Sequence, residues 1–194
     1  MKLYKELAEF YYSIENNHRN IFEDASFIRS MKFNYTSPIL LDIGCGTGIM
    51  VRTARHLRCE AYGVDMHNHA GEKWIFAQDL RDPFSLAEKN LPSQVPMVLC
   101  IEVAEHIQKS KHDVFCDTIA NHLMIGGVLV FSSAFPGQGG EEHVGVERPT
   151  YWRSKMHNRG IGYEPMMTQA LSLFWNNITS PMMWLPANVQ VFKR

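Results

Sequence analysis

The chain has 194 residues, 45% of them hydrophobic, and a formal net charge of −1 at pH 7. This length suits one domain with a sizeable core, so we expect residues 1–194 to fold as a single domain. The near-zero charge provides no overall basic surface for nucleic acid or for an anionic membrane. No stretch approaches the roughly 18 apolar residues of a membrane-spanning helix. Four cysteines without a C-x-x-C pair are typical of reduced thiols in a cytoplasmic protein.

Two helical patterns open the chain. Apolar residues recur at helical spacing over Leu3–Ile14, and a second helix is predicted over Ile21–Met31. We expect residues 1–37 to form an N-terminal helical extension and residues 38–194 to form the core. The extension would either pack against the core or cover a ligand site, and the sequence leaves both roles open.

From residue 38 onward, apolar runs of strand length alternate with helical patterns. This alternation predicts an α/β fold, a doubly wound Rossmann-like sheet of about seven mostly parallel strands with helices on both faces. We expect the strands at Ile39–Ile43, Ala61–Val64, Trp74–Ala77, Met97–Ile101, Val128–Ser132, Gly160–Tyr163 and Asn188–Lys193. We expect the helices at Ile49–Leu57, Ile107–Leu123, Thr150–Arg159 and Met167–Asn176, followed by a loop over Asn177–Ala187.

Three glycines at alternate positions follow the first predicted strand: Gly44, Gly46 and Gly48. Without a Cβ, glycine lets the backbone turn sharply and come close to a ligand. A strand, a glycine-rich turn and a helix begin a nucleotide-binding unit, whose N–H groups favour polar or anionic ligand groups. Asp65 ends the next strand about 20 residues after Gly44, the offset at which an acid reaches a ribose diol. The alternatives are a tight turn that binds nothing and a solvated acid at a strand end.

The glycine spacing, with an acid just before it, resembles the signature of the class I S-adenosylmethionine-dependent methyltransferases. That family has an acidic residue followed by G-x-G-x-G, where dinucleotide sites usually have G-x-G-x-x-G. Three later segments resemble the family's other motifs in the right order: Ala77–Leu80, Val98–His106 and Gly126–Phe131. The resemblance implies that Asp65 holds the ribose hydroxyls of S-adenosylmethionine and that Asp79 meets the adenine amino group. The cofactor residues so implied are Asp42, Gly44, Cys45, Gly46, Gly48, Asp65, Met66, Asp79, Leu80 and Glu102.

The segment after the fourth strand reads Glu102-x-x-Glu105-His106. On a helical turn, carboxylates at this spacing share a face beside the imidazole, and together they can bind a divalent metal. The pattern resembles the metal-binding motif of the ubiquinone-pathway O-methyltransferases and of the small-RNA terminal 2′-O-methyltransferases. In the RNA group a histidine beyond the fifth strand completes the site, and His143 is the only histidine in the matching loop. The resemblance implies Mg or Mn held by Glu102, Glu105, His106 and His143. Alternatively, these side chains face the cofactor, cap a helix and pack, without a metal.

A glycine-rich loop, Ser132–Val144, leaves the sheet at the same edge, and its length indicates a functional loop over the pocket. With Pro149, Tyr151 and Trp152 it resembles a branch of the same superfamily. Members of that branch often accompany glycosyltransferases and polysaccharide genes, or occur in phages, which implies a sugar hydroxyl as acceptor. The two aromatic side chains would stack on a sugar ring or, alternatively, anchor a helix to the sheet.

We therefore predict an S-adenosylmethionine-dependent methyltransferase that acts on an oxygen of a small-molecule or saccharide acceptor, with no membrane partner. The expected catalytic residues are His143, His106 and Glu105. A histidine titrates near neutral pH, so it can take the proton that a hydroxyl loses during methyl transfer.

Other functions remain open at this level. The main alternative is an RNA 2′-O-methyltransferase with a bound metal. The near-neutral charge argues against it, because RNA binding usually needs a basic face. A nicotinamide-dependent oxidoreductase and a non-catalytic, cofactor-binding partner of a second subunit are further alternatives. The residues that would form a small local basic face are Arg148, Arg153, Lys155 and Arg159.

Overall fold

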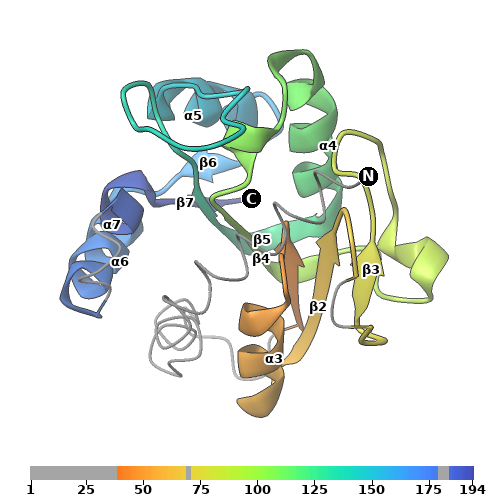
Figure 1. Cartoon of the computed structure of the whole chain (residues 1–194). Coiled ribbons are helices and arrows are strands. Elements are labelled where there is room, and N and C mark those ends of the chain that lie inside the picture. Colours follow the sequence, from red (N-terminus) through yellow and green to blue (C-terminus); the bar gives the residue numbers. More distant parts are fainter. Residues whose placement is uncertain (1–38, 69–70, 179–183) are drawn as a thin grey trace.

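A computed structural model describes residues 39–68, 71–178 and 184–194 of the chain. The helical cover expected over residues 1–37, with its helices Leu3–Ile14 and Ile21–Met31, lies outside these described residues. Within them, seven strands form one sheet in the order β3-β2-β1-β4-β5-β7-β6 (Figure 1). The strands are β1 (Ile39–Ile43), β2 (Glu60–Asp65), β3 (Ile75–Ala77), β4 (Val95–Ile101), β5 (Leu123–Ser132), β6 (Gly162–Tyr163) and β7 (Gln190–Lys193).

The sheet is mostly parallel. Strands β3, β2, β1, β4 and β5 pair in parallel, and β7 pairs antiparallel with both β5 and β6. The chain moves outward from β1 to β2 and β3, and then returns to place β4 on the other side of β1. In open α/β sheets, ligands bind beyond the carboxyl ends of the strands at such a reversal. The expected doubly wound, mostly parallel sheet of seven strands is confirmed.

Helices cover both faces of the sheet (Figure 1). Side chains of a strand point alternately to its two faces, and both faces of β1 are covered. Leu40 therefore belongs to one hydrophobic core and Leu41 to the other, and both are fully buried. The helices are α3 (Ile49–His56), α6 (Pro165–Ile178) and α7 (Trp184–Asn188) on the first face, and α4 (His112–His122) and α5 (Pro149–His157) on the second.

The helix expected over Ile107–Leu123 is shorter than its sequence pattern. It is α4, and it begins at His112, because two 3₁₀ turns occupy the approach to it: Ala104–His106 and Lys109–Lys111. The imidazole Nε2 of His112 lies 2.7 Å from the carbonyl oxygen of Ile107 and must donate to it. This bond holds Ile107 in an extended conformation, so the helix starts only after it.

Two C-terminal expectations also change. β5 begins at Leu123 rather than Val128, because an irregularity in the pairing with β4 lets the early residues join the sheet. The described part of the expected loop Asn177–Ala187 is helical: its first residues end α6, and the residues from Trp184 onward begin α7. Its proline, Pro186, lies in the first turn of that short helix, where a missing N–H costs no hydrogen bond.

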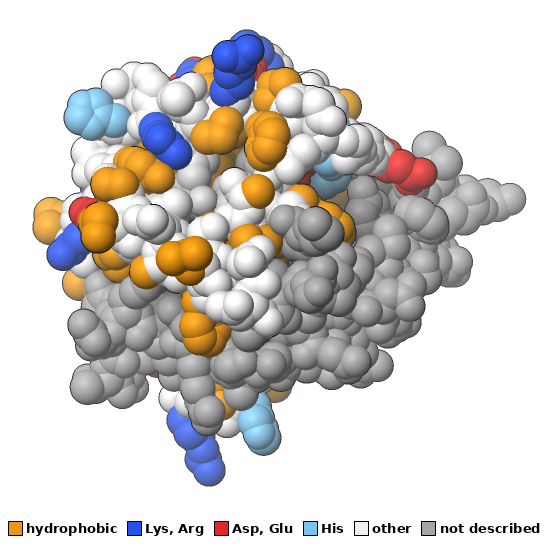
Figure 2. All heavy atoms as spheres, turned by 90° about the vertical axis from the view of Figure 1, so that its left-hand side faces the viewer, with side chains coloured by type: hydrophobic (Ala, Val, Ile, Leu, Met, Phe, Trp, Pro, Cys, Tyr) orange, Lys and Arg blue, Asp and Glu red, His pale blue; other side chains and the backbone are white. Residues whose placement is uncertain are grey.

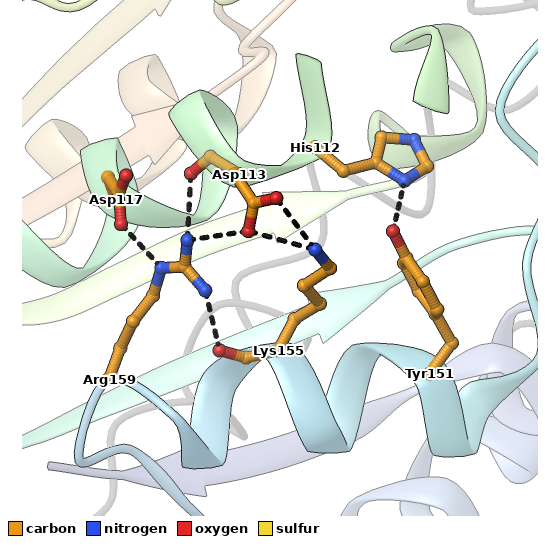
Figure 3. Close-up of polar contacts among 6 residues, drawn as sticks. All are labelled: His112, Asp113, Asp117, Tyr151, Lys155 and Arg159. Carbon is orange, nitrogen blue, oxygen red and sulfur yellow. Dashed lines mark hydrogen bonds and ion pairs between the residues drawn. The ribbon is translucent and has the colours of Figure 1, made fainter. Parts of the chain in front are cut away.

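Helices α4 and α5 are fastened to each other on the outer side of the second face (Figure 3). Arg159 donates to Asp117 over 2.6 Å and to Asp113 over 3.0 Å, and Lys155 donates to Asp113 over 2.8 Å. Exposed ion pairs of this kind stabilise little. The stronger anchor is Trp152, which is 1% exposed and packs inside the second core.

The opposite side of the molecule exposes apolar side chains of α6 and α7 (Figure 2). No residue of α6 carries a charge. Among residues 39–68, 71–178 and 184–194, no helix combines the length and the hydropathy needed to cross a bilayer. The exposed apolar residues of this side are Met166, Leu173, Phe174 and Trp184.

Candidate functional site

The glycine turn lies at the carboxyl end of β1, and all three glycines have a left-handed backbone. The φ angles are 79° at Gly44, 54° at Gly46 and 80° at Gly48. A Cβ on Gly44 would lie 2.3 Å from a methyl carbon of Val103, and one on Gly48 would lie 2.2 Å from the tip of Ile75. Only glycine combines this backbone with such close packing, so the turn is a tight, fixed surface.

Asp65, at the carboxyl end of β2, faces the same turn. Its Oδ2 accepts a hydrogen bond of 2.8 Å from the N–H of Gly46. Its Oδ1 accepts none from the part of the chain that the structure describes. A carboxylate held through one oxygen keeps the other for a ligand hydroxyl. The half-buried Met66 follows directly.

Two other residues expected at the cofactor lie beneath the turn. Asp42 is fully buried, and Cys45 is 5% exposed. The side chain of Cys45 packs on β2, where a Cβ on Gly63 would lie 2.6 Å from its sulfur. Any contact of Cys45 with a ligand above the turn would therefore use its backbone.

Asp79 follows β3 and is held by a neighbouring guanidinium. Arg81 donates to both carboxylate oxygens, over 2.8 Å through Nε and 2.6 Å through Nη2. These hydrogen bonds lower the pKa of Asp79, so it stays ionised and keeps its capacity to accept a further hydrogen bond. Leu80, next to it, is 7% exposed.

Glu102 adopts an unusual backbone just beyond β4. Its φ of 54° is left-handed, which is rare for a residue with a side chain. Its N–H donates to the carbonyl oxygen and the hydroxyl of Ser132, over 3.1 and 3.0 Å. Its carboxylate oxygens each accept from the amide of Asn188 over 3.2 Å. The expectation that Glu102 and Glu105 share one helical turn is wrong, because the 3₁₀ turn begins only at Ala104.

Glu105, His106 and His143 come together at this edge of the sheet. One ligand atom from each lies within 4.8 Å of the other two. The imidazoles of His106 and His143 meet edge to face, with ring centres 5.0 Å apart. Glu105 is 1% exposed, and its Oε1 accepts from the N–H of Ala134 over 3.1 Å. Glu102 is not part of this group, so three of the four expected metal ligands converge.

Burial sets the protonation of this cluster. Burial and the nearby charge of Glu102 raise the pKa of Glu105 to about 8. Burial also raises the pKa of Glu102, although hydrogen bonds with Ser132, Asn188 and Glu105 oppose the shift. It lowers the pKa of both His106 and His143. The two imidazoles are therefore neutral near pH 7, beside a carboxyl group that holds its proton.

A comparison with protein families matches residues 13–170 to the methyltransferase domain family. The chain belongs to this family. It is a methyltransferase, and its sheet has the Rossmann-like fold of the S-adenosylmethionine-dependent enzymes. A comparison of this chain with curated proteins finds no match.

Solved structures share the fold of the methyltransferase at low sequence identity. A TehB-like SAM-dependent methyltransferase from Corynebacterium glutamicum has a TM-score of 0.70 at 16% identity, over 98% of this chain and 99% of that one. A SAM-dependent methyltransferase from Archaeoglobus fulgidus has a TM-score of 0.65 at 16% identity, over 95% and 100%. The sugar N-methyltransferase KedS8 from Streptoalloteichus has a TM-score of 0.62 at 17% identity, over 79% and 85%.

The methyltransferase holds its loop after β5 with residues that the sequence analysis did not single out. Asn188 is 1% exposed, and it accepts from the side chain of Gln138 over 2.9 Å. A Cβ on Gly140 would lie 2.1 Å from the ring of His143, so this glycine is needed for the imidazole to fit. The sequence gives only a weak indication of this role for Asn188. Asn188 and Gln190 are two amide side chains among the apolar residues of the last predicted strand.

Tyr151 and Trp152 anchor α5 in the methyltransferase. Trp152 lies in the core, with its ring centre 5.5 Å from that of Phe131, so no sugar ring can stack on it. The hydroxyl of Tyr151 lies 3.1 Å from Nδ1 of His112 (Figure 3). Because Nε2 of His112 donates to a carbonyl, Nδ1 is the acceptor of this bond.

Proposed function

We propose that this methyltransferase transfers the methyl group of S-adenosylmethionine to a hydroxyl of a small-molecule or saccharide acceptor. The observation that carries this proposal is the cluster of Glu105, His106 and His143 at the carboxyl edge of the sheet. A hydroxyl loses its proton as it is methylated, and a neutral, half-buried imidazole beside the acceptor can take it. The likeness to a sugar N-methyltransferase supports a saccharide as one class of acceptor.

The glycine turn fits a nucleoside with a ribose diol. One oxygen of Asp65 is held by the N–H of Gly46, which leaves Oδ1 for a ribose hydroxyl. A Cβ on Gly44 has no room because Val103 fills that space, so the turn is held close to the segment after β4. Bound S-adenosylmethionine supplies a methyl group that is already activated, so the protein has to align the acceptor and exclude water. The residues proposed to hold it are Asp42, Gly44, Cys45, Gly46, Gly48, Asp65, Met66, Asp79, Leu80 and Glu102.

We assign the role of general base to His143. Its Nδ1 is buried and has no hydrogen-bond partner among the described residues, so it has capacity for a proton. His106 contacts its ring from the side, and Glu105 lies within reach of both. These two residues would hold His143 in place and tune its basicity.

A divalent metal, Mg or Mn, is a second proposal for the same cluster. Two imidazoles beside one carboxyl group suit Mn²⁺ better than Mg²⁺, which prefers oxygen ligands, and the unpartnered Nδ1 of His143 fits the role of a metal ligand. A bound metal would lower the pKa of an acceptor hydroxyl. Titration of the protein with Mn²⁺, followed by electron paramagnetic resonance, tests this. We expect binding that His143→Ala weakens, and equal binding by both proteins would contradict the proposal.

The structure reduces support for RNA as acceptor. Of the four cations that would form a basic face, Lys155 and Arg159 are paired with Asp113 and Asp117 (Figure 3). The planar group of Arg153 lies 3.8 Å from the ring centre of Tyr163. RNA binding that weakens steeply as salt rises would restore this alternative, since phosphate contacts have that signature.

Two variants test the main proposal by separating binding from turnover. Asp65→Asn removes the charge that a ribose diol would bind, so calorimetry should show affinity for S-adenosylhomocysteine weakened about tenfold to a hundredfold. His143→Ala should keep that affinity and lower kcat by about 10² or more on a hydroxyl acceptor. Wild-type protein without affinity for S-adenosylhomocysteine would refute the function. Normal turnover by His143→Ala would refute the role of the histidine alone.

Two broader expectations remain proposals. We propose that residues 1–194 form a single domain with a helical cover over 1–37. We also propose a cytoplasmic location, supported by the four cysteines, which are all free and buried.

A further inference from the structure

A chain of side-chain amides joins three segments that lie far apart in the sequence. The N–H of Phe135 donates to Oε1 of Gln138 over 3.0 Å. Nε2 of Gln138 donates to Oδ1 of Asn188 over 2.9 Å. Nδ2 of Asn188 donates to both carboxylate oxygens of Glu102 over 3.2 Å. The loop after β5, the end of α7 and the end of β4 thus form one hydrogen-bonded unit.

The partners fix the direction of every bond in this chain. A backbone N–H only donates, so Gln138 accepts through Oε1 and donates through Nε2, and Asn188 in turn accepts through Oδ1 and donates through Nδ2. Each donor therefore points toward Glu102, and bonds aligned in this way polarise one another. The amide of Asn188 makes the last hydrogen bond of this chain, to the carboxyl group of Glu102.

The position of the Glu102 side chain depends on its hydrogen bonds with Asn188. Its left-handed backbone, with φ of 54°, is uncommon for a residue with a side chain, and its carboxylate is largely enclosed. A buried carboxylate needs donors to remain charged. Asn188 supplies one of them, beside the hydrogen bond with Ser132, from a position that is 1% exposed, where no solvent competes.

We propose that Asn188 is a positioning residue that couples Glu102, on the cofactor side of the site, to the loop that follows β5, on the acceptor side. This rests on the proposed function, in which Glu102 faces S-adenosylmethionine. Gln138 extends the coupling to Phe135, and Glu105 holds the neighbouring Ala134, both near the start of that loop. Coupling between two sites is reciprocal. A bound cofactor should therefore order the loop, and a loop that is no longer ordered should lower the affinity for the cofactor.

The test uses the full chain and S-adenosylhomocysteine as the probe. Affinity is measured by calorimetry, and the order of residues 134–148 by hydrogen exchange with and without the probe. Asn188→Asp places a carboxylate against Glu102, while Glu102→Gln with Asn188→Asp exchanges donor and acceptor and restores the bond. Gln138→Leu cuts only the link to the loop. Ser172→Ala is the matched control, because it removes a 2.7 Å hydrogen bond to the carbonyl oxygen of Pro186 in α7 without touching the amide chain.

Asn188→Asp should weaken affinity for the probe about tenfold or more. The exchanged pair should return to within about threefold of Glu102→Gln alone, a rescue that a merely structural role would not produce. The control should bind the probe like wild type, within about twofold. Gln138→Leu should bind it more weakly, by the same factor as the loop coupling that it removes, because the coupling is reciprocal. Asn188→Asp and Gln138→Leu should both lose the slowing of loop exchange that the probe causes, and the control should keep it.

Unchanged affinity in Asn188→Asp, or an exchanged pair no better than that single variant, overturns the coupling. If Asn188→Asp does not fold by circular dichroism, Gln138→Leu decides, and a loop that still responds to the probe as in wild type overturns the proposal. Wild-type protein that does not bind the probe overturns the proposed function, and the coupling with it. Binding that Asp65→Asn abolishes but Asn188→Asp leaves intact overturns the coupling alone.

Discussion

Replacing Gly44 by alanine should be among the most destabilising single changes in the glycine turn. Its φ of 79° is left-handed, and this backbone costs alanine about 1–2 kcal/mol. The new Cβ would also lie 2.3 and 2.8 Å from the two methyl carbons of Val103. Overpacking of a tight contact costs about 1–3 kcal/mol, so the sum is about 2–5 kcal/mol, a large share of the stability of a typical domain.

Gly126 offers a matched control for this prediction. Its φ is 81°, nearly that of Gly44, but no described atom lies within 4 Å of where its Cβ would be. Gly126→Ala should therefore carry only the backbone cost. Urea unfolding of both variants measures the difference, which we expect at about 1–3 kcal/mol, or a fall in Tm of about 2–4 °C for each kcal/mol. Equal losses in the two variants would refute the argument that Val103 closes the space above Gly44.

Two further predictions concern histidines. Burial lowers the pKa of His122, whose Nε2 accepts from the N–H of Leu86 and whose Nδ1 donates to the carbonyl of Thr118. The free energy of unfolding should therefore be level above about pH 6.5 and fall below it by up to about 1.4 kcal/mol per pH unit, because the unfolded chain binds the proton more readily. His122→Gln should make this fall shallower in urea titrations, and parallel curves would count against it. Gly140→Ala should push the ring of His143 aside, lowering kcat while affinity for S-adenosylhomocysteine holds; unchanged kcat would mean that the loop adapts.

The parts of the fold that the sequence predicted are those that local pattern determines. β1 has the expected bounds, Ile39–Ile43, because a short apolar run followed by glycines has few alternatives. α5 begins at Pro149, one residue before the expected Thr150, and a proline suits the first turn of a helix. Both patterns depend only on neighbouring residues, so tertiary contacts do not change the structure that they predict.

The start of α4 could not be predicted from pattern, because a tertiary contact decides it. Apolar spacing favours a helix from Ile107, but His112 binds the carbonyl oxygen of Ile107 and Tyr151 binds His112 from α5. Tyr151 lies 39 residues further along the chain than His112. The sequence pattern contains no information on which carbonyl a buried histidine will choose.

The arrangement of the candidate site was only partly predictable for the same reason. The sequence places Glu105, His106 and His143 at one edge of the sheet, and the structure brings them together. It does not reveal that Glu102 stays outside this cluster and binds Asn188, because that amide lies 86 residues later in the chain. A local pattern shows which acidic residues are near one another in the sequence. Hydrogen-bond donors from distant segments then determine which of these side chains lie together in the site.

The segment from Glu102 to His106 links the parts of the site because its residues face in different directions. The left-handed backbone of Glu102 breaks the helical spacing that would have placed both acids on one face. Val103 can then close on the glycine turn, while Glu105 turns toward the loop after β5. The unfavourable backbone at one residue is therefore the condition for the geometry of the others, as is common at functional sites.

Relief of that backbone by Glu102→Gly should stabilise the turn locally but disconnect Asn188, so we expect weaker binding of S-adenosylhomocysteine without a loss of fold. Affinity retained by Glu102→Gly would mean that backbone shape, rather than the carboxylate, is what this position contributes.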